Sequence, residues 1–198
     1  MGHAPAPIQI GTYGNSDGLS VLRAEANGPH RQLDYLHRYV SGLGASSVVE
    51  EPFYFDRDYL AEFSAFYGVS AAGYPNTCRR LHFFSGDPPV TAESFRELLD
   101  SRADSPARRE FQNRYLGFSV VRPLPNAPLG RTVLKWWSPD AKVVAPSRDY
   151  KVHLAGVRLT VSGLAWQQQD TGTAACATVS IWSMLHSAAF DERHAVPT

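Results

Sequence analysis

A nearly uninterrupted apolar segment near the end of the chain restricts the fold more than any other feature. Residues 176–189 read CATVSIWSMLHSAA, and Ser180, Ser183 and Ser187 follow Cys176 by four, seven and eleven residues. In a helix with about 100° between successive residues, these four positions lie on one side and form a single polar seam. Apolar side chains cover the remaining sides. The pattern predicts a helix that is almost entirely buried, which requires a sizeable surrounding core.

The composition supplies such a core and excludes several classes of partner. The chain has 198 residues, 43% of them hydrophobic and 19% charged, as in an ordinary globular protein. Lys plus Arg and Asp plus Glu both number 19, so no bulk charge attracts nucleic acid or an anionic membrane. We therefore expect no nucleic-acid partner and no membrane association. The sequence contains no signal-peptide pattern and only two isolated cysteines, which indicates a cytoplasmic protein.

Helical and strand patterns occupy different parts of the sequence. Leu33, Leu36 and Val40 recur at helical spacing, and Asp56 and Thr91 precede two further helical patterns as N-cap residues. Helices are therefore expected over 31–42, 57–67, 92–101 and 107–115, and strands over 47–55, 81–84, 116–124, 132–137, 150–154 and 157–161. This order predicts an α+β fold, with helices mainly before residue 115, antiparallel strands after it, and finally the buried helix that carries Cys176.

The loop before the apolar helix contains residue types suited to catalysis. Three glutamines and Asp170 precede Cys176, which is expected at the helix N-terminus. The positive end of a helix dipole favours a thiolate and lowers the pKa of a thiol placed there. An upstream amide could donate a hydrogen bond to an oxyanion formed when the thiolate attacks a carbonyl. Over residues 166–190, the arrangement resembles the nucleophile segment of papain-like cysteine peptidases, in particular a bacterial branch related to peptide-processing peptidases.

The resemblance implies a function and assigns roles to individual residues. Cys176 would be the nucleophile of acyl transfer at a peptide or isopeptide bond, with a peptide or protein as substrate. The family commonly has its oxyanion-hole glutamine six residues before the cysteine, where this chain has Asp170. A one-residue loop insertion would make Gln169 the first choice for this role and Gln168 the second. Residues 150–198 would begin a papain-like peptidase domain, and residues 1–149 would form an N-terminal accessory region, separate from it or packed with it as one compact unit.

A cysteine–histidine mechanism also needs an imidazole near the thiol. The family places its histidine many tens of residues after the cysteine, whereas 22 residues follow Cys176 here. His186 is ten residues along the same helix, about 15 Å away, and His194 lies in a polar tail. His153 precedes the cysteine on an expected strand, as in circularly permuted relatives. We therefore expect either that His153 is the base or that this chain is the front part of a longer protein and inactive alone.

Two other functions remain open at this stage. The chain could be a non-catalytic interaction or regulatory module of a larger bacterial protein, in which Cys176 would have ordinary thiol reactivity. It could also bind nucleotides or nucleic acid through Arg79, Arg80, Arg131 and the pair at 108–109, although it lacks a glycine-rich phosphate loop. No cofactor or metal is expected. No predicted helix places a His four residues from another His, a Cys or a carboxylate, which is the spacing that a metal site would favour.

Overall fold

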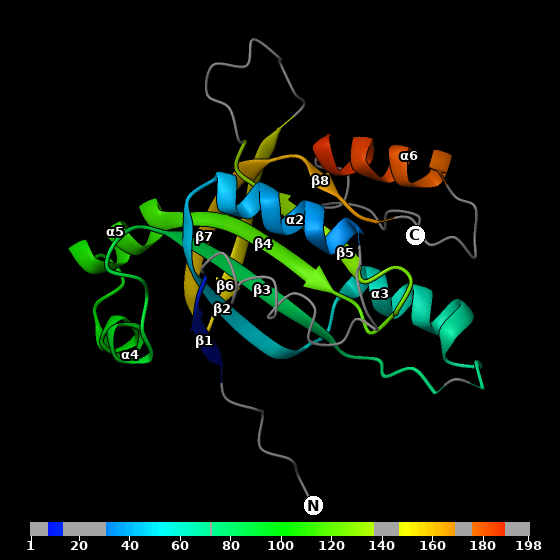
Figure 1. Cartoon of the computed structure of the whole chain (residues 1–198), viewed down its shortest axis with the longest axis horizontal. Helices are drawn as coiled ribbons and strands as arrows, with labels where there is room; N and C mark the ends of the chain where they lie inside the picture. Colours follow the sequence, from blue (N-terminus) through cyan, green and yellow to red (C-terminus); the bar gives the residue numbers. More distant parts are fainter. Residues whose placement is uncertain (1–7, 14–30, 72, 137–146, 169–175, 189–198) are drawn as a thin grey trace, which may run out of the picture.

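A six-stranded antiparallel sheet forms the centre of the computed structural model, which describes residues 8–13, 31–71, 73–136, 147–168 and 176–188 (Figure 1). In order across the sheet, its strands are β1 (Gln9–Thr12), β2 (Ala45–Tyr54), β3 (Cys78–Ser85), β4 (Tyr115–Val121), β5 (Leu129–Leu134) and β8 (Ala165–Trp166). The expected mixture of helices and antiparallel strands is confirmed. Three of the strands precede residue 115, however, so the main sheet draws on both parts of the chain.

The register of the sheet separates two apolar faces. Val49 lies opposite His82, and His82 lies opposite Phe118 on the next strand. Because side chains alternate between the two faces of a strand, Val48 and Phe83 lie on the other side. The register of β2 shifts between Glu51 and Tyr54, the region that contains Pro52.

Helix α2 (Arg31–Gly42) covers one face of this sheet. Leu33, Leu36 and Val40 are fully buried, as their spacing predicts, and they belong to the same core as Val48 and Phe83. Burying a leucine or valine side chain contributes about 1.5–3 kcal/mol, so this stripe is enough to hold α2 in place.

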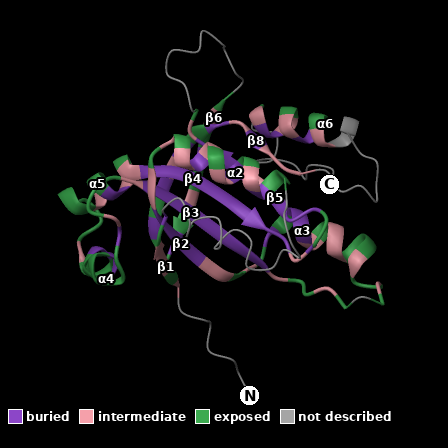
Figure 2. Cartoon of the chain, viewed as in Figure 1, coloured by how far each residue is buried: buried purple, intermediate pink, exposed green. Residues whose placement is uncertain are grey.

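The opposite face carries a second sheet and most of the other helices. The hairpin of β6 (Arg148–Leu154) and β7 (Val157–Gly163) lies there, and its apolar side chains share the larger core with α3 (Arg57–Glu62), α4 (Ala92–Asp100), α5 (Pro106–Arg114) and α6 (Cys176–Ser187). The N-caps predicted at Asp56 and Thr91 are both present, and a π-helical turn, Phe63–Tyr67, extends α3. Buried residues concentrate in the strands of the main sheet (Figure 2).

The prediction of an almost entirely buried final helix is wrong. On α6 the side chains of Trp182 and His186 are buried, whereas Ile181 is 50% and Met184 is 64% exposed. Apolar residues on nearly all sides of the helix left no periodic signal to identify the side that faces the core. In the expected helix over 57–67, Tyr59 is buried, whereas Phe66 is largely exposed. None of the described helices has the length and apolar character needed to cross a membrane.

Residues on both sides of position 149 contribute to one sheet and one core. Ala165 of β8 pairs with Val133 of β5. Trp182 of α6 belongs to the same buried cluster as Phe118 of β4. In the described part of the chain, the segment from 150 onward is therefore packed directly on the elements that precede it.

Candidate functional site

Helix α6 begins at Cys176, so the predicted position of this residue at a helix N-terminus is confirmed for the backbone. Trp182 is 1% exposed and fixes the middle of the helix in the core, with its ring centroid 4.0 Å from that of His186. His186 lies in the last turn, at the end of the helix away from Cys176. Gln169, the first choice for the oxyanion donor, lies outside the described residues.

Gln168 is held by the loop between β4 and β5. Its side-chain Oε1 accepts a hydrogen bond from the Leu129 backbone N–H at 3.3 Å, and its Nε2 donates to the Asn126 carbonyl at 3.0 Å. Its backbone N–H donates to the Leu129 carbonyl at 2.8 Å. The Gln168 amide thus fixes the point at which the chain leaves β8, and its assignment as the second-choice oxyanion donor stays a prediction.

Arg122 connects this anchor point to helix α3. The guanidinium is buried, and its Nη1 donates to Glu62 Oε2 at 2.9 Å. Its Nη2 donates to the carbonyls of Ala127 and Gln168 at 2.8 and 3.0 Å. Burial raises the pKa of the Glu62 carboxyl, although the charge and hydrogen bonds of Arg122 oppose this shift. One buried cation therefore positions α3, the β4–β5 loop and the end of β8 relative to one another.

His153, the strand-borne candidate for the base, lies on β6 with an exposed side chain. Its backbone carbonyl accepts a hydrogen bond from Arg80 Nη2 at 2.7 Å. Among the described residues, no hydrogen bond joins the His153 ring to α6. The role of His153 as a base therefore stays a prediction.

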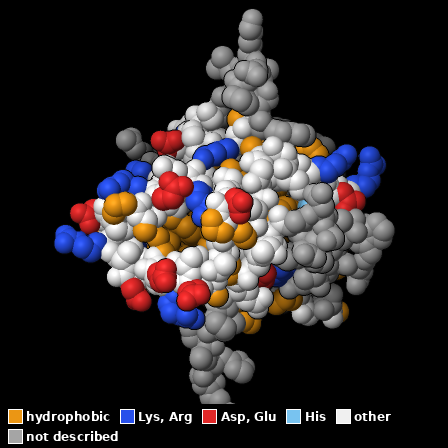
Figure 3. Space-filling model, turned by 60° about the vertical axis from the view of Figure 1, so that its left-hand side comes forward, with side chains coloured by type: hydrophobic (Ala, Val, Ile, Leu, Met, Phe, Trp, Pro, Cys, Tyr) orange, Lys and Arg blue, Asp and Glu red, His pale blue; other side chains and the backbone are white. Residues whose placement is uncertain are grey.

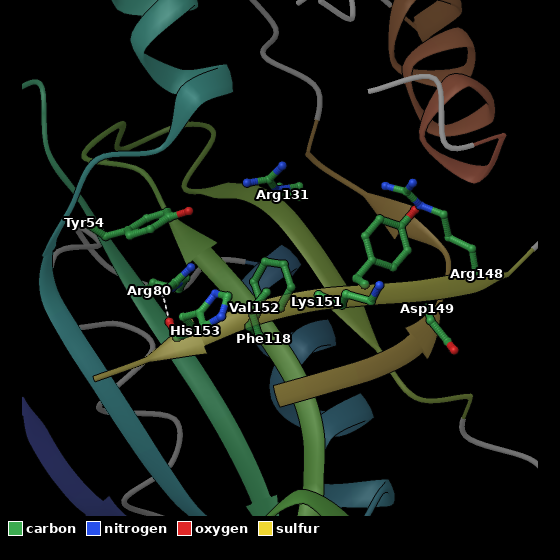
Figure 4. Close-up of a pocket in the computed structure, with 10 residues that line it drawn as sticks. Tyr54, Arg80, Phe118, Arg131, Arg148, Asp149, Lys151, Val152 and His153 are labelled. Carbon is green, nitrogen blue, oxygen red and sulfur yellow. Dashed lines mark hydrogen bonds between the residues drawn. The ribbon is translucent and has the colours of Figure 1, made fainter. Parts of the chain in front are cut away.

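His153 instead lines a pocket of ≈360 Å³ between β6 and the main sheet (Figure 4). The pocket is lined by side chains from five strands: Tyr54, Arg80, Phe118, Arg131, Arg148, Asp149, Tyr150, Lys151, Val152 and His153. Two of its aromatic rings carry a guanidinium, with Arg80 4.0 Å from the Tyr54 ring centroid and Arg148 4.2 Å from that of Tyr150. Stacking of this kind restricts the arginine side chains and favours a preformed pocket wall.

A buried hydrogen-bonded cluster supports Arg80. The Oε2 atom of Glu51 accepts from Arg80 Nε at 2.5 Å and from His82 Nε2 at 2.9 Å. His82 Nδ1 lies 2.9 Å from the Tyr115 hydroxyl. When Nε2 carries the ring hydrogen, Nδ1 accepts a hydrogen bond from this hydroxyl. Burial lowers the pKa of His82, although the hydrogen bond to Glu51 opposes this shift, and burial raises the pKa of Tyr115 well above its ordinary value. The cluster is satisfied internally and serves to orient Arg80.

A second cluster holds Arg131 on the opposite side of the pocket. Asp56 caps α3 through Oδ1, which accepts from the backbone N–H groups of Asp58 and Tyr59. Its Oδ2 accepts from Arg131 Nη2 at 3.1 Å, and Asp58 Oδ2 lies 3.6 Å from Arg131 Nη1. The negative charges of Asp56 and Asp58 raise the pKa of Arg131 against the effect of burial. The carboxylates therefore keep Arg131 charged and fixed at the pocket wall.

The sequence analysis missed most of this pocket. Arg80 and Arg131 were considered only as parts of a surface that binds nucleotides or nucleic acid, and Tyr150 and Arg148 were not considered as site residues. The Arg131–Asp56 pair joins residues 75 positions apart, and nothing in the local sequence indicates it. The run of charged and aromatic residues over 148–153 was the available signal, but it was interpreted only as a strand.

A second hollow, of ≈270 Å³, lies between α4 and α5 and is mostly apolar. Figure 3 shows apolar side chains gathered on this side of the molecule with acidic and basic side chains around them. Among the described residues, no group of three or more His, Cys, Asp or Glu side chains could hold a metal ion. Comparisons with family models, with curated proteins and with solved structures found no match to this chain.

Proposed function

We propose that this chain provides the nucleophile of a thiol-dependent acyl transfer at a peptide or isopeptide bond, as in papain-like cysteine peptidases. The observation that carries the proposal is the start of α6 at Cys176. The buried Trp182 and the fixed end of β8 support it, because they hold in place the described elements on either side of positions 169–175. A thiol at this position would be favoured as the thiolate by the helix dipole.

The proposed reaction has two halves, acylation of the thiol and hydrolysis of the thioester, and each half forms one bond and breaks one. The Cys176 thiolate attacks the carbonyl carbon, and the oxyanion receives hydrogen bonds from the Cys176 backbone N–H and from Gln169. The carbon–nitrogen bond then breaks as the leaving amine gains a proton, which leaves a thioester. Water attacks the thioester and regenerates the thiol. His153 is the candidate for the proton transfers in both halves.

The proposal predicts that an activated peptide ester acylates Cys176 once per chain. The rate should rise with pH around a midpoint below about 8.5, the ordinary pKa of a cysteine thiol, because the folded helix stabilises the thiolate. Intact-mass and peptide-mass analysis over a range of pH measures both the site and the midpoint.

Two substitutions make this test specific. Cys176→Ser should abolish the acylation, whereas Cys78→Ser should leave it unchanged, because Cys78 is 2% exposed. If the pH midpoint of acylation were at or above the midpoint measured for the unfolded chain, the proposal would be refuted and an interaction module would be favoured. His153→Ala should slow acylation with the fold intact if His153 is the base.

The non-catalytic alternative is favoured by a different observation. The pocket along β6 is preformed, with two arginines held at its wall by the carboxylates of Glu51 and Asp56. A surface of this kind suits recognition of a partner, whether or not Cys176 is reactive.

A further inference from the structure

The hairpin of β6 and β7 has two outer edges, and the register identifies which backbone groups face each of them. Lys151 pairs with Thr160 and His153 pairs with Arg158. In an antiparallel pair, alternate residues direct both their N–H and their C=O away from the partner strand. The His153 carbonyl bonds to Arg80, outside the hairpin, so the residues of β6 that face its outer edge are Asp149, Lys151 and His153.

The outer edge of β7 is closed by a side chain. The Gln112 Nε2 donates to the Thr160 carbonyl at 2.8 Å, and the Thr160 N–H donates to Gln112 Oε1 at 2.7 Å. This amide occupies both backbone groups of Thr160 in the manner of a neighbouring strand. Proteins commonly cover strand edges in such ways, because an open edge pairs readily with another chain.

The outer edge of β6 is open in the described structure. Apart from the bond between Arg80 and the His153 carbonyl, no described group bonds to the backbone of Asp149, Lys151 or His153 on this side. The pocket of ≈360 Å³ is lined by every residue from 148 to 153. Since successive side chains of a strand point in opposite directions, a pocket lined by six consecutive residues runs along the strand edge.

Figure 4 shows the arrangement of this edge. β6 crosses the strands of the main sheet, with β7 on one side of it and Tyr54 and Arg131 on the other. The edge therefore faces a channel whose far wall is built from Tyr54, Arg80 and Arg131.

Two hydrogen-bond donors around this edge have no acceptor among the described residues. The Tyr150 hydroxyl and Arg131 Nε are buried without a hydrogen-bond partner there. Buried polar groups of folded proteins are rarely left unsatisfied, so these donors point to a ligand that carries acceptors. Among the described residues of this edge, Lys151 supplies a cation beside the Arg148 guanidinium that stacks on Tyr150, and Asp149 supplies a carboxylate.

We propose that the open edge of β6 binds an extended, acidic peptide segment, which adds as a further strand and lies in the pocket. The peptide backbone pairs with the outward N–H and C=O groups of Asp149 and Lys151, and its carbonyls are acceptors for the unsatisfied donors. An acidic side chain is placed against Lys151. This binding does not depend on the chemistry of Cys176 and extends beyond the proposed acyl transfer.

The test uses a fluorescein-labelled hexapeptide of alternating valine and glutamate as the probe. Binding is measured by fluorescence anisotropy to the full chain carrying Cys176→Ser, so that thiol chemistry cannot contribute. Two matched peptides replace glutamate by lysine or carry N-methyl groups on every amide. The glutamate peptide should bind at least about tenfold more tightly than either, because charge and backbone pairing both contribute.

Substitutions in the hairpin test the edge itself. Lys151→Pro removes an outward N–H and obstructs the edge, but it leaves the bonds between β6 and β7 intact, since proline is tolerated at such positions. It should weaken binding by about tenfold or more. Arg158→Pro makes the same change on the outer edge of β7 and should leave binding unchanged. Lys151→Ala, which keeps the N–H, should weaken binding by a smaller factor.

Hydrogen exchange provides the decisive readout. The peptide should slow exchange of the amides of Asp149 and Lys151 and leave that of Arg158 unaffected. Circular dichroism confirms that each variant is folded. Equal binding of the N-methylated peptide, unchanged binding to Lys151→Pro, or no binding of the glutamate peptide at about one millimolar to the folded chain would each overturn the proposal.

Discussion

At the scale of single residues, two acidic side chains beneath the pocket have pKa values that are shifted in opposite directions. Burial alone would raise the pKa of Glu51, but hydrogen bonds from His82 and Arg80 outweigh it and the pKa is lowered. For Asp58, burial dominates and the pKa is raised, although Arg131 opposes the shift. The difference follows from geometry, because Glu51 accepts two short hydrogen bonds whereas Asp58 Oδ2 is buried without a hydrogen-bond partner among the described residues.

Asp58→Asn should therefore stabilise the protein, or at least not destabilise it, at neutral pH. A carboxyl whose pKa is raised by folding binds its proton more tightly in the native state, so stability falls as the pH rises from the ordinary pKa of 3.8 through the raised value. The substitution removes the charged carboxylate and with it this loss of stability. Urea unfolding of both proteins across this pH range measures the difference, which should disappear or reverse at the acid end, where Asp58 is protonated.

Asp104→Asn is the matched control for this prediction. Its side chain is 78% exposed, so its removal should change the free energy of unfolding little at any pH. If Asp58→Asn instead lost stability at neutral pH, the Asp58–Arg131 contact would contribute more than burial of the carboxylate costs.

At the scale of elements, α6 depends on one large side chain. Trp182 is the largest of the fully buried residues, whereas Ile181 and Met184 on the same helix face outward. We expect Trp182→Ala to cost about 3–5 kcal/mol in the free energy of unfolding, as for other buried aromatic residues. Met184→Ala should cost less than about 0.5 kcal/mol because its side chain is largely exposed. Chemical denaturation measures both.

Cys176→Ser completes this comparison. It should change stability much less than Trp182→Ala, since the helix is anchored at its centre rather than at its first residue. A larger loss for the serine variant would indicate that Cys176 is a packed core residue, and would weaken the proposal that it is a nucleophile.

At the scale of the whole molecule, the hairpin and the main sheet are in close contact at Gly163. A Cβ atom built on this residue of β7 would clash with the backbone carbonyl oxygen of Leu134 on β5. We expect Gly163→Ala to destabilise the protein by about 1–3 kcal/mol, because the hairpin must move away from the sheet. Thermal and chemical denaturation measure the loss.

Gly11→Ala is the control for this close approach. A Cβ atom there would lie 3.8 Å from Val48 Cγ1, an ordinary contact, so the variant should be nearly as stable as the native chain. Equal stability of the two alanine variants would mean that the hairpin can move away from the sheet without a loss in the free energy of unfolding. The same displacement in Gly163→Ala should also weaken the peptide binding proposed for β6, since the pocket walls come from both sheets.

Local patterns predicted a large part of the fold. The stripe of Leu33, Leu36 and Val40 identified α2 and its buried side, and Asp56 and Thr91 identified two helix starts. These features depend on residues within one or two turns of each other, so a single sequence contains the whole signal. The short strand β8 was missed, because two residues carry no periodicity.

In the candidate site, too, some features follow from the local sequence and others depend on the tertiary structure. The sequence by itself determined that a helix begins at Cys176, since the change from a polar loop to an apolar helix is local. Only the tertiary structure decided which side of α6 is buried, that Gln168 is held by the β4–β5 loop, and that the edge of β6 is open toward Arg131. Each of these depends on contacts between residues far apart in the chain, and such contacts form only when the two sheets pack together.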